Sequence, residues 1–439
     1  MKLDKSLKNK LIEQSLKGKL KRNEQLAGKG LGLSFDAADD RARYTDFRSH
    51  PAYKQIEIMR EGSASLGIED PFFRLHEGCS GATAVIGGKT YVNYASYNYL
   101  GLAGHPEVIK ASAEAAARYG TSVSASRIVS GERPVHQQLE RELAALYQAD
   151  DALALVSGHA TNVSVIGYLM GPKDLVLHDE YIHNSSLVGA QLSGARRMPF
   201  KHNSVEALEQ LLVQHRGQFE RVLIVTEGLF SMDGDVPDLR AMVNLKQRHQ
   251  AWLMVDEAHA LGVLGEKGLG SFELTGVNPT DVDIWMGTLS KTLSGCGGYI
   301  AGVQPLIDIL RNLAPGFLYS VGMPAPTAAA SLQALQIFLR EPERVSRNQR
   351  NSEVFLQRAR ALGLDTGSSV GRAVVPVILG GSVKAARLSA ELFRNGINVQ
   401  PILYPAVPEK SARLRFFISS EHTDSQLTET CAVLQAYMD

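Results

Sequence analysis

Short apolar runs alternate with amphipathic stretches along most of the chain. The amphipathic stretches repeat their apolar residues every three to four positions, which is typical of helices with one buried face. Buried strands that alternate with helices are typical of a parallel sheet covered on both faces. The pattern therefore predicts an α/β fold built on a large, doubly wound, mostly parallel sheet. The predicted strands are Ala152–Val156, Leu175–Leu177, Val222–Val225, Trp252–Val255 and Ile284–Met286, and the predicted helices include His136–Tyr147, Val205–His215 and Leu239–His249.

The pattern changes from about Pro326 onward. A long helix is expected first, and then a mixture of strands and helices that reads as a smaller α+β domain. We therefore expect three parts: residues 1–70 as an extension and lead-in, 71–325 as the large domain and 326–439 as the small domain. The elements predicted in the last part are the helices Ala328–Leu339, Val383–Arg394 and Asp424–Met438 and strands near Val374–Leu379 and Leu414–Ile418.

The N-terminal segment differs from the rest in composition. Eight basic residues and two acidic ones precede Asn23, with few apolar residues between them. One interpretation is a solvated, partly helical leader or linker. The other is a docking or inter-domain segment beside a larger assembly, with Gly28–Gly32 as its hinge. The composition leaves both open.

The overall composition narrows the classes of function. The chain has 439 residues, of which 44% are hydrophobic and 21% charged, an ordinary globular balance that excludes wholesale disorder. Lys plus Arg and Asp plus Glu both number 46, and this zero net charge argues against a nucleic-acid binder. Three scattered cysteines are too few for a disulfide framework or a zinc site, so we expect no metal and a reducing, cytoplasmic setting. No apolar run reaches the roughly 18 residues of a membrane helix, so a soluble protein is expected.

Polar residues follow four of the predicted strands directly. In open parallel sheets ligands bind beyond the carboxyl ends of the strands, and these residues are therefore expected to form one site. Each has an ordinary alternative when taken alone, because an aspartate caps loops, a lysine usually faces solvent and a serine is common in turns. Their common position at one edge of one sheet favours the site. The segments are Ser157-Gly158-His159, Thr226–Gly234, Asp256-Glu257-Ala258-His259 and Gly287–Lys291.

This set of residues suits an aldehyde cofactor that carries a phosphate. A lysine amine forms an imine with an aldehyde, and Lys291 is that lysine, preceded by the hydroxyls of Thr288 and Ser290. An aspartate at a strand end pairs with a protonated pyridine nitrogen, which keeps the ring an electron sink. The turn at Gly158 feeds a helix N-terminus, whose free N–H groups bind phosphate. His183 is expected to stack on a flat ring.

The chain resembles the α-oxoamine synthases, which are fold-type-I enzymes that use pyridoxal 5'-phosphate. The resemblance runs from about Tyr91 to the C-terminus and rests on several motifs in the family's order. The motifs are Thr226-Glu227-Gly228-Leu229-Phe230-Ser231-Met232-Asp233-Gly234, Val255-Asp256-Glu257-Ala258-His259, Gly287-Thr288-Leu289-Ser290-Lys291, Ser96–Leu102, Ser126–Gly131 and Ala412-Arg413-Leu414-Arg415.

The resemblance implies a set of catalytic and cofactor-binding residues. Lys291 would form the Schiff base and then act as base and acid on the α-carbon of the substrate. Asp256 would pair with the pyridinium nitrogen, and His183 would stack on the ring. His259 is implied with them as the fourth catalytic residue. The phosphate and the phenolic oxygen would be held by Gly158, His159, Ser231, His259, Thr288 and, from a neighbouring subunit, Ser320.

The resemblance also implies the substrates and the assembly. Arg415 would bind the carboxylate of the amino acid through its bidentate guanidinium, and Asn98 would lie near the substrate. The active sites would be shared between the subunits of a homodimer, with Ser320 reaching the neighbour's phosphate. The chain departs from its relatives at Val321 and Gly322, where hydroxyl side chains are common.

Two further positions bear on the choice of substrate. Ala406 stands where the members that make 8-amino-7-oxononanoate have a substrate-contacting threonine, which argues against a pimeloyl-type substrate. Tyr97 before Asn98 is similar to serine palmitoyltransferase.

The expected reaction is a decarboxylative condensation of an amino acid with an acyl thioester, which gives an α-aminoketone, carbon dioxide and a free thiol. The acyl donor is either acyl-coenzyme A or an acyl carrier protein, and the sequence identifies neither the donor nor the amino acid. An aminotransferase of the same fold would share the aspartate and the lysine but would not be expected to have the Thr226–Gly234 and Ala412–Arg415 motifs. A non-catalytic partner subunit would lack the lysine, which is present here as Lys291.

Overall fold

The computed structural model describes residues 44–65 and 67–438. The basic segment before Asn23 and the predicted hinge at Gly28–Gly32 lie outside the described residues. The chain divides into two compact units, Met1–Asp70 and Pro71–Asp439, and the finer division at residue 326 stays a prediction. In the first unit the described residues form the short helix η1 (Phe47–Ser49) and the helix α3 (Pro51–Ser65), and the side chain of Asp46 caps η1 by accepting a hydrogen bond from Arg48 N.

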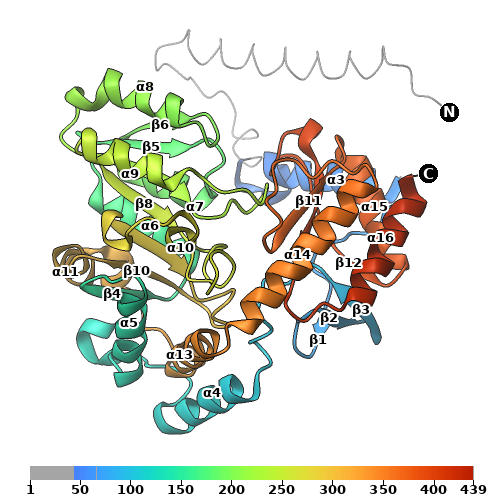
Figure 1. Ribbon diagram of the computed structural model, residues 1–439, viewed down its shortest axis with the longest axis horizontal. Helices are drawn as coiled ribbons and strands as arrows, with labels where there is room; N and C mark the ends of the chain where they lie inside the picture. The colour runs from blue at the N-terminus through green and yellow to red at the C-terminus, as the bar shows by residue number, and fades with distance from the viewer. Residues whose placement is uncertain (1–43, 66, 439) are drawn as a thin grey trace. The chain divides into compact units, whose positions relative to one another are not determined.

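The second unit contains a seven-stranded sheet, as the alternating pattern predicts (Figure 1). Its strands lie in the order β4-β10-β9-β8-β7-β5-β6, and β6, β5, β7, β8 and β9 all run parallel. Only β10 runs antiparallel to its two neighbours. The strands are β4 (Asp151–Leu155), β5 (Leu175–Asp179), β6 (Arg196–Phe200), β7 (Val222–Glu227), β8 (Trp252–Asp256), β9 (Ile284–Thr288) and β10 (Gly298–Gly302).

Helices cover both faces of this sheet because successive strand residues point to opposite sides. In β7, Leu223 and Val225 pack in one apolar cluster with α6, α7, α11 and α12, whereas Val222 and Ile224 pack in the other with α5, α8 and α9. The sheet is therefore doubly wound. The helices named here are α5 (Pro134–Leu146), α6 (Gly158–Leu169), α7 (Asn184–Leu192), α8 (Val205–His215), α9 (Leu239–Arg248), α11 (Gln304–Leu313) and α12 (Pro315–Leu318).

Several strands extend beyond the apolar run that predicts them. β7 ends at Glu227, β8 at Asp256 and β9 at Thr288, so these three polar residues belong to the sheet and do not follow it. Glu227 pairs in register with Asp256, and Asp256 with Met286. The last residue of such a strand is polar because it faces a ligand site. A search for apolar runs therefore ends before it.

The second unit also contains two smaller sheets, one mostly from residues 76–93 and one from residues 374–417. In the three-stranded sheet, β14 lies between β11 and β13 and runs antiparallel to both; in the four-stranded sheet, β12 runs parallel to β3 and so joins an N-terminal segment to a C-terminal one. The strands are β1 (His76–Glu77), β2 (Thr83–Ile86), β3 (Lys89–Asn93), β11 (Val374–Ile378), β12 (Ile397–Asn398), β13 (Gln400–Ile402) and β14 (Arg413–Phe417). The helices are α14 (Glu343–Ala361), α15 (Ser382–Arg394) and α16 (Asp424–Met438).

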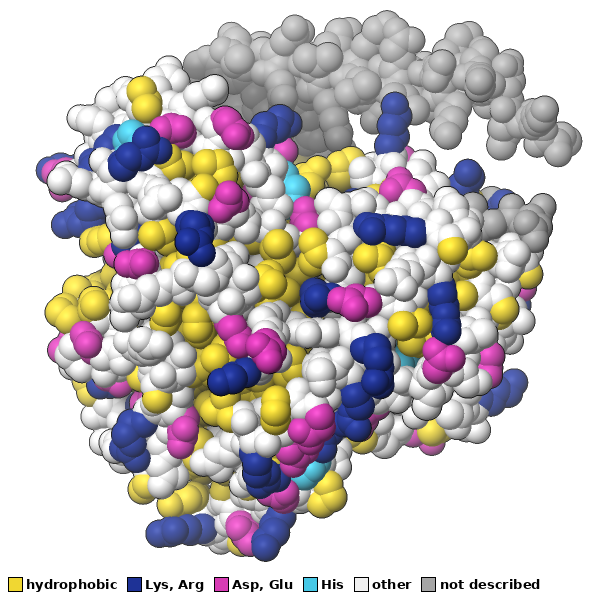
Figure 2. All heavy atoms as spheres, viewed as in Figure 1, with side chains coloured by type: hydrophobic (Ala, Val, Ile, Leu, Met, Phe, Trp, Pro, Cys, Tyr) yellow, Lys and Arg dark blue, Asp and Glu magenta, His cyan; other side chains and the backbone are white. Residues whose placement is uncertain are grey.

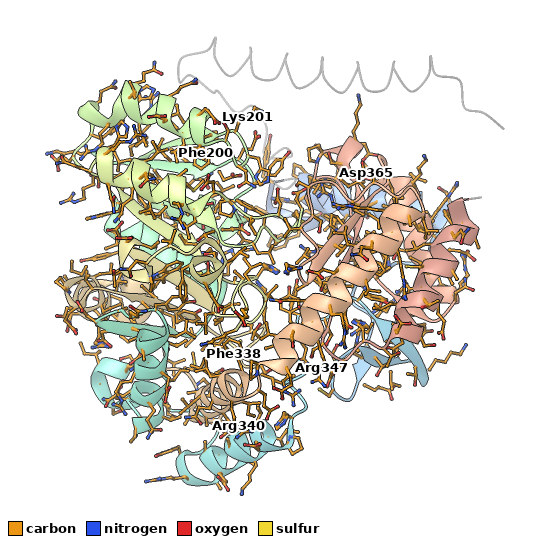
Figure 3. All side chains as sticks on the ribbon, in the orientation of Figure 1. Phe200, Lys201, Phe338, Arg340, Arg347 and Asp365 are labelled. Carbon is orange, nitrogen blue, oxygen red and sulfur yellow. The ribbon has the colours of Figure 1, made fainter. Side chains whose placement is uncertain are left out.

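The helix α13 is longer than the sequence pattern predicts. It spans Ala325–Arg340 and carries Pro326 in its first turn, where a missing N–H costs nothing because it would have no partner within the helix. α13 packs against α4 (Pro106–Tyr119), and Arg340 at its end reaches the carboxylate of Glu107 on α4 (Figure 3). The predicted start at residue 328 is therefore wrong by one helical turn.

The surface agrees with the balanced composition. On the face that Figure 2 shows, Lys and Arg side chains are interspersed with Asp and Glu side chains. Among the described helices, none combines the length and the apolar character that crossing a membrane requires.

Candidate active site

A cavity of about 270 Å³ lies at the carboxyl ends of the parallel strands. Nine of the eleven residues predicted for the site line it, and five strands of the large sheet together with β14 bring them there. The nine are Gly158, His159, His183, Ser231, Asp256, His259, Thr288, Lys291 and Arg415. The ends of neighbouring strands thus gather residues that are up to 257 positions apart along the chain.

The phosphate-binding part of the prediction corresponds to the start of α6. Ser157 caps this helix by accepting a hydrogen bond from Ala160 N at 3.3 Å, so the N–H groups of Gly158 and His159 lie in the first turn, where the helix itself offers no acceptor. A side chain at position 158 would approach Thr288 Oγ1 to 2.8 Å. Glycine therefore lets the backbone come close to Thr288, and the arrangement suits a phosphate.

Asp256 is held in one orientation at the bottom of the cavity. Its Oδ2 accepts a hydrogen bond from Asn162 Nδ2 at 2.9 Å, and its Oδ1 accepts one from Ala258 N at 3.0 Å. Asn162 Nδ2 also donates to Ser185 Oγ at 2.9 Å, and that oxygen lies 2.7 Å from His183 Nδ1. The four side chains form one hydrogen-bonded chain from Asp256 to the imidazole.

His183 begins α7 as its N-cap residue. Its Nδ1 accepts a hydrogen bond from Ser185 N at 3.3 Å, so the ring proton of the neutral imidazole resides on Nε2. Burial by the surrounding protein lowers the pKa of His183, against an opposing effect of Asp256. A neutral imidazole at the open side of the cavity suits stacking on an uncharged aromatic ring.

His259 is a second neutral histidine in the cavity. Its Nδ1 lies 2.7 Å from the hydroxyl of Tyr99, and burial holds the pKa of His259 well below its ordinary value. Burial also raises the pKa of Tyr99, so this phenol keeps its proton. We assign the tyrosine as the donor, which leaves the Nε2–H of His259 as the second donor of the pair.

Lys291 follows β9 and reaches the same cavity. Its Nζ lies 5.5 Å from the centre of the Tyr97 ring. Burial lowers the pKa of Lys291 to about 8, although Asp256 and Glu227 act in the opposite direction. A substantial fraction of the amine is therefore neutral and nucleophilic near neutral pH.

Arg415 enters from β14 with part of its guanidinium uncommitted. Its Nη1 donates to the carbonyl oxygen of Ser231 at 3.0 Å, and the group lies over the ring of Phe417 at 4.5 Å. Its buried Nε has no hydrogen-bond partner among the described residues. A buried cationic donor without an acceptor suits an anionic ligand such as a carboxylate.

Two predicted residues lie elsewhere in this chain. Asn98 lines a different cavity, and its amide is engaged because Nδ2 donates to Ser80 O and Oδ1 accepts from Ala103 N. Ser320 lies outside the main cavity beside Arg127. The expected role of Ser320 concerns a neighbouring subunit, so its position in a single chain leaves that role untested.

Four further residues of the site had no predicted role, although Tyr99 and Glu227 lie in the Ser96–Leu102 and Thr226–Gly234 motifs. Tyr99, Asn162 and Ser185 orient His259, Asp256 and His183, and Glu227 lines the cavity beside Asp256. Asn162 lies one turn after Gly158 on α6, so helical spacing from the phosphate turn identifies it once the helix is recognised.

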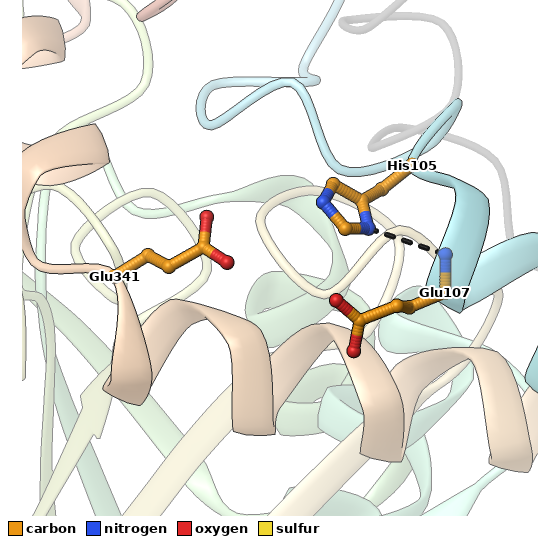
Figure 4. Close-up of side chains that lie close together, drawn as sticks. All are labelled: His105, Glu107 and Glu341. Atoms are coloured by element: carbon orange, nitrogen blue, oxygen red, sulfur yellow. Dashed lines mark hydrogen bonds between the residues drawn. The ribbon is translucent and has the colours of Figure 1, made fainter.

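One cluster of side chains resembles a metal site. Among the described residues, His105, Glu107 and Glu341 form the one group of candidate ligand side chains that lie close enough to share an ion (Figure 4). Both carboxylates are already paired, because Arg340 binds Glu107 and Glu341, and Arg344 binds Glu341. His105 Nδ1 accepts a hydrogen bond from Glu107 N. His105 therefore serves as the N-cap of α4, and the two carboxylates bind the arginines near the end of α13.

The residues of the cavity fit pyridoxal phosphate. They offer a lysine for the aldehyde, a carboxylate for the ring nitrogen, a flat neutral imidazole, and a helix start for the phosphate. Neutral Nε2–H donors and hydroxyls remain for the phenolic oxygen. The donor set therefore matches the cofactor group by group.

Comparisons with known proteins show which families and solved structures the chain is similar to. The profile of the aminotransferase class I and II family matches residues 89–434. The 8-amino-7-oxononanoate synthase of Symbiobacterium thermophilum is 40% identical over 349 residues, which cover 80% of this chain and 88% of that protein. Serine palmitoyltransferase of Sphingomonas wittichii has a similar solved structure, with a TM-score of 0.85 and 28% identity over 89% of this chain and 98% of that one. A further solved structure, 8-amino-7-oxononanoate synthase from Francisella tularensis, has a TM-score of 0.69 and 26% identity over 79% and 98% of the two chains.

Proposed function

The chain belongs to the α-oxoamine synthases, which are pyridoxal-phosphate-dependent transferases of the aminotransferase class I and II fold, and we propose that Lys291, Asp256 and Arg415 carry its condensation of an amino acid with an acyl thioester. The products are an α-aminoketone, carbon dioxide and a free thiol. The observation that carries this assignment is the convergence on one cavity of a lysine of lowered pKa, a fixed carboxylate and an arginine whose buried Nε has no partner among the described residues.

Each of these side chains has a distinct task. When bound, pyridoxal phosphate supplies an aldehyde for imine formation and a ring that accepts the electron pair of the α-carbon. The neutral Nζ of Lys291 would form the imine with that aldehyde, with release of water, and would later remove and return the proton at the α-carbon of the amino acid. Asp256, oriented by Asn162, would pair with the protonated ring nitrogen. Arg415 binds the carboxylate of the amino acid and orients the α-carbon toward Lys291.

The two histidines and the helix start hold the remaining groups. His183 would lie against the ring face, and His259 would donate its Nε2–H to the phenolic oxygen together with the Ser231 hydroxyl. Gly158 and His159 would donate backbone N–H groups to the phosphate, and Thr288 would add a hydroxyl.

The acyl donor is an acyl-coenzyme A or an acyl carrier protein, and both deliver the same thioester to this cavity. An assay of thiol release decides between condensation and transamination. We expect free thiol to appear only when the amino acid, the cofactor and an acyl thioester are all present. A transfer of the amino group to a 2-oxo acid without thiol release would identify an aminotransferase instead.

The assembly proposed for this chain is a homodimer with shared active sites. The segments 125–131 and 319–322 lie side by side, since Gly322 N donates to Ala125 O. They carry exposed apolar side chains, with Tyr319 81% and Val129 77% exposed. Apolar surface of this kind favours contact with a second copy, which would bring Ser320 to the neighbour's phosphate.

A further inference from the structure

Glu227 is a fully enclosed acid that the proposed mechanism leaves without a task. It is the last residue of β7 and pairs in register with Asp256 on β8, so the two carboxyl side chains point to the same face of the sheet. Only 3% of Glu227 is exposed, yet the residue lines the cavity. Burial of a second carboxyl group beside Asp256 is costly unless the group has a role.

The carboxylate of Glu227 bridges two segments of the site. Its Oε1 accepts a hydrogen bond from His183 N at 2.7 Å, and its Oε2 accepts one from Ser231 N at 3.3 Å. His183 starts α7 and Ser231 lies in the turn after β7, so no regular secondary structure joins them. Each oxygen of this one side chain therefore fixes a different wall of the cavity.

We propose that Glu227 is a further positioning residue of this site, whose carboxyl group holds the His183 and Ser231 segments at a fixed separation and couples electrostatically to Lys291. The inference rests on the proposed function, in which these two segments would contact the face and the phenolic edge of the cofactor. Glu227 acts through His183, Ser231 and Lys291 and takes no part in bond making.

The charges around Glu227 support this coupling. Asp256 faces it from β8, Lys291 from the segment after β9 and the backbone of His183 from α7, while Arg415 from β14 acts on the same lysine. Burial, with Asp256 as the next cause, raises the pKa of Glu227 to about 8. Above this pH the carboxylate raises the pKa of Lys291, because a nearby negative charge favours the ammonium form.

Glu257 provides a matched control. It is also fully buried and adjacent to Asp256, and its oxygens accept hydrogen bonds from the backbone N–H and the hydroxyl of Ser271. It does not line the cavity, and the pKa of Lys291 does not depend on it. Glu257→Gln therefore measures the effect of removing a buried carboxyl group beside Asp256 that has no proposed coupling to Lys291.

The experiment measures how the full-length apoprotein captures pyridoxal phosphate, with the absorbance and visible circular dichroism of the bound cofactor recorded across pH 6–10. Glu227→Gln keeps the size of the side chain but cannot accept from both N–H groups and carries no charge. We expect the midpoint of the capture rate to fall by about one pH unit, the cofactor dichroism to change and kcat to drop about tenfold. Glu257→Gln should leave the midpoint and the dichroism as in the unmodified protein.

Glu227→Asp serves as the conservative variant, because it keeps the charge but its shorter chain reaches only one of the two N–H groups. It should retain the midpoint and lose part of kcat. An unchanged midpoint and dichroism in Glu227→Gln, or an equal change in Glu257→Gln, would overturn the proposal. If Glu227→Gln does not fold, the test passes to Glu227→Asp. The proposal is then overturned if the cofactor dichroism of Glu227→Asp equals that of the unmodified protein. Cofactor capture needs no thioester, so it tests Glu227 independently of the condensation. A protein that binds pyridoxal phosphate but releases no thiol would disprove the proposed condensation and leave the test of Glu227 valid.

Discussion

At the residue scale, the character of the site depends on which side chains stay uncharged. Burial lowers the pKa of His183, His259 and Lys291, so two neutral imidazoles surround the fixed carboxylate of Asp256, and the amine of Lys291, with a pKa of about 8, loses its proton far more readily than an ordinary lysine. The hydrogen bonds of Ser185 and Tyr99 then place the proton of each imidazole on Nε2. The protonation states of these side chains near pH 7 therefore depend on packing as much as on residue type.

The lowered pKa of Lys291 has a direct consequence for cofactor capture. Only the neutral amine attacks an aldehyde, so the capture rate should rise with pH and level off above a midpoint near pH 8. Stopped-flow absorbance with apoprotein and pyridoxal phosphate measures this profile. A rate that continues to rise through the ordinary lysine range would show that the amine is solvated.

Replacement of Lys291 tests its role as the acid and base. Lys291→Ala should retain the fold and still bind the cofactor through Asp256 and the start of α6, while kcat falls by about 10²- to 10⁴-fold. Steady-state thiol release measures the loss, and a thermal melt is the control for folding. Full activity in this variant would contradict the assignment.

Replacement of Arg415 by lysine separates charge from geometry. Arg415→Lys keeps the positive charge but loses the planar pair of donors, so the KM for the amino acid should rise about 10- to 100-fold with a smaller change in kcat. Initial rates at varied amino-acid concentration measure this. An unchanged KM for the amino acid, with an altered KM for the thioester, would place Arg415 on the acyl donor instead.

At the scale of elements, a half-buried histidine joins the segments that carry the site. His202, directly after Phe200 and Lys201 at the end of β6 (Figure 3), lies between Asp179 and Asp235 at 2.9 and 3.0 Å. Asp235 also accepts a hydrogen bond from the hydroxyl of Ser368 in the C-terminal part. Hydrogen bonds to the two aspartates raise the pKa of His202 to about 10, although burial opposes them.

The stabilisation that His202 provides decreases as the pH rises. Because the folded pKa of His202 lies above its unfolded value, this stabilisation is complete below about pH 6.5 and is lost as the pH rises toward 10. His202→Gln should lower the free energy of unfolding by about 3 kcal/mol near pH 6.5. The deficit should shrink at higher pH. Urea unfolding at several pH values measures it, and a pH-independent deficit would mean that His202 contributes only packing.

Much of the fold and of the site follows from local sequence. Parallel strands meet at one edge, so the residues at their ends converge without further information, which is why nine of the eleven predicted side chains share a cavity. The residues that orient them were not predicted. The sequence motifs include Tyr99 and Glu227, but local sequence does not reveal their contacts or those of Asn162, because these contacts span 44 to 160 positions.

At the scale of the whole molecule, the proposed homodimer predicts complementation between inactive subunits. A Lys291→Ala subunit lacks its own amine but would supply Ser320 to its partner, and a Ser320→Trp subunit would do the reverse. Refolding the two variants together should recover up to about a quarter of the activity of the unmodified protein, because one site in four combines intact contributions. Light scattering should report a dimer for each variant. Dimers without any recovery would mean that each subunit carries a complete site.

The central claim is that one cavity joins an amino acid to an acyl thioester with loss of the carboxyl group. The most direct test is the release of labelled carbon dioxide from a pool of carboxyl-labelled amino acids, supplied with pyridoxal phosphate and either mixed acyl-coenzyme A esters or an acylated carrier protein. The account predicts release that depends on the thioester, matches the free thiol in amount and falls by about 10²-fold or more in Lys291→Ala. Release without any thioester, or thiol formation without carbon dioxide from either donor, would contradict it.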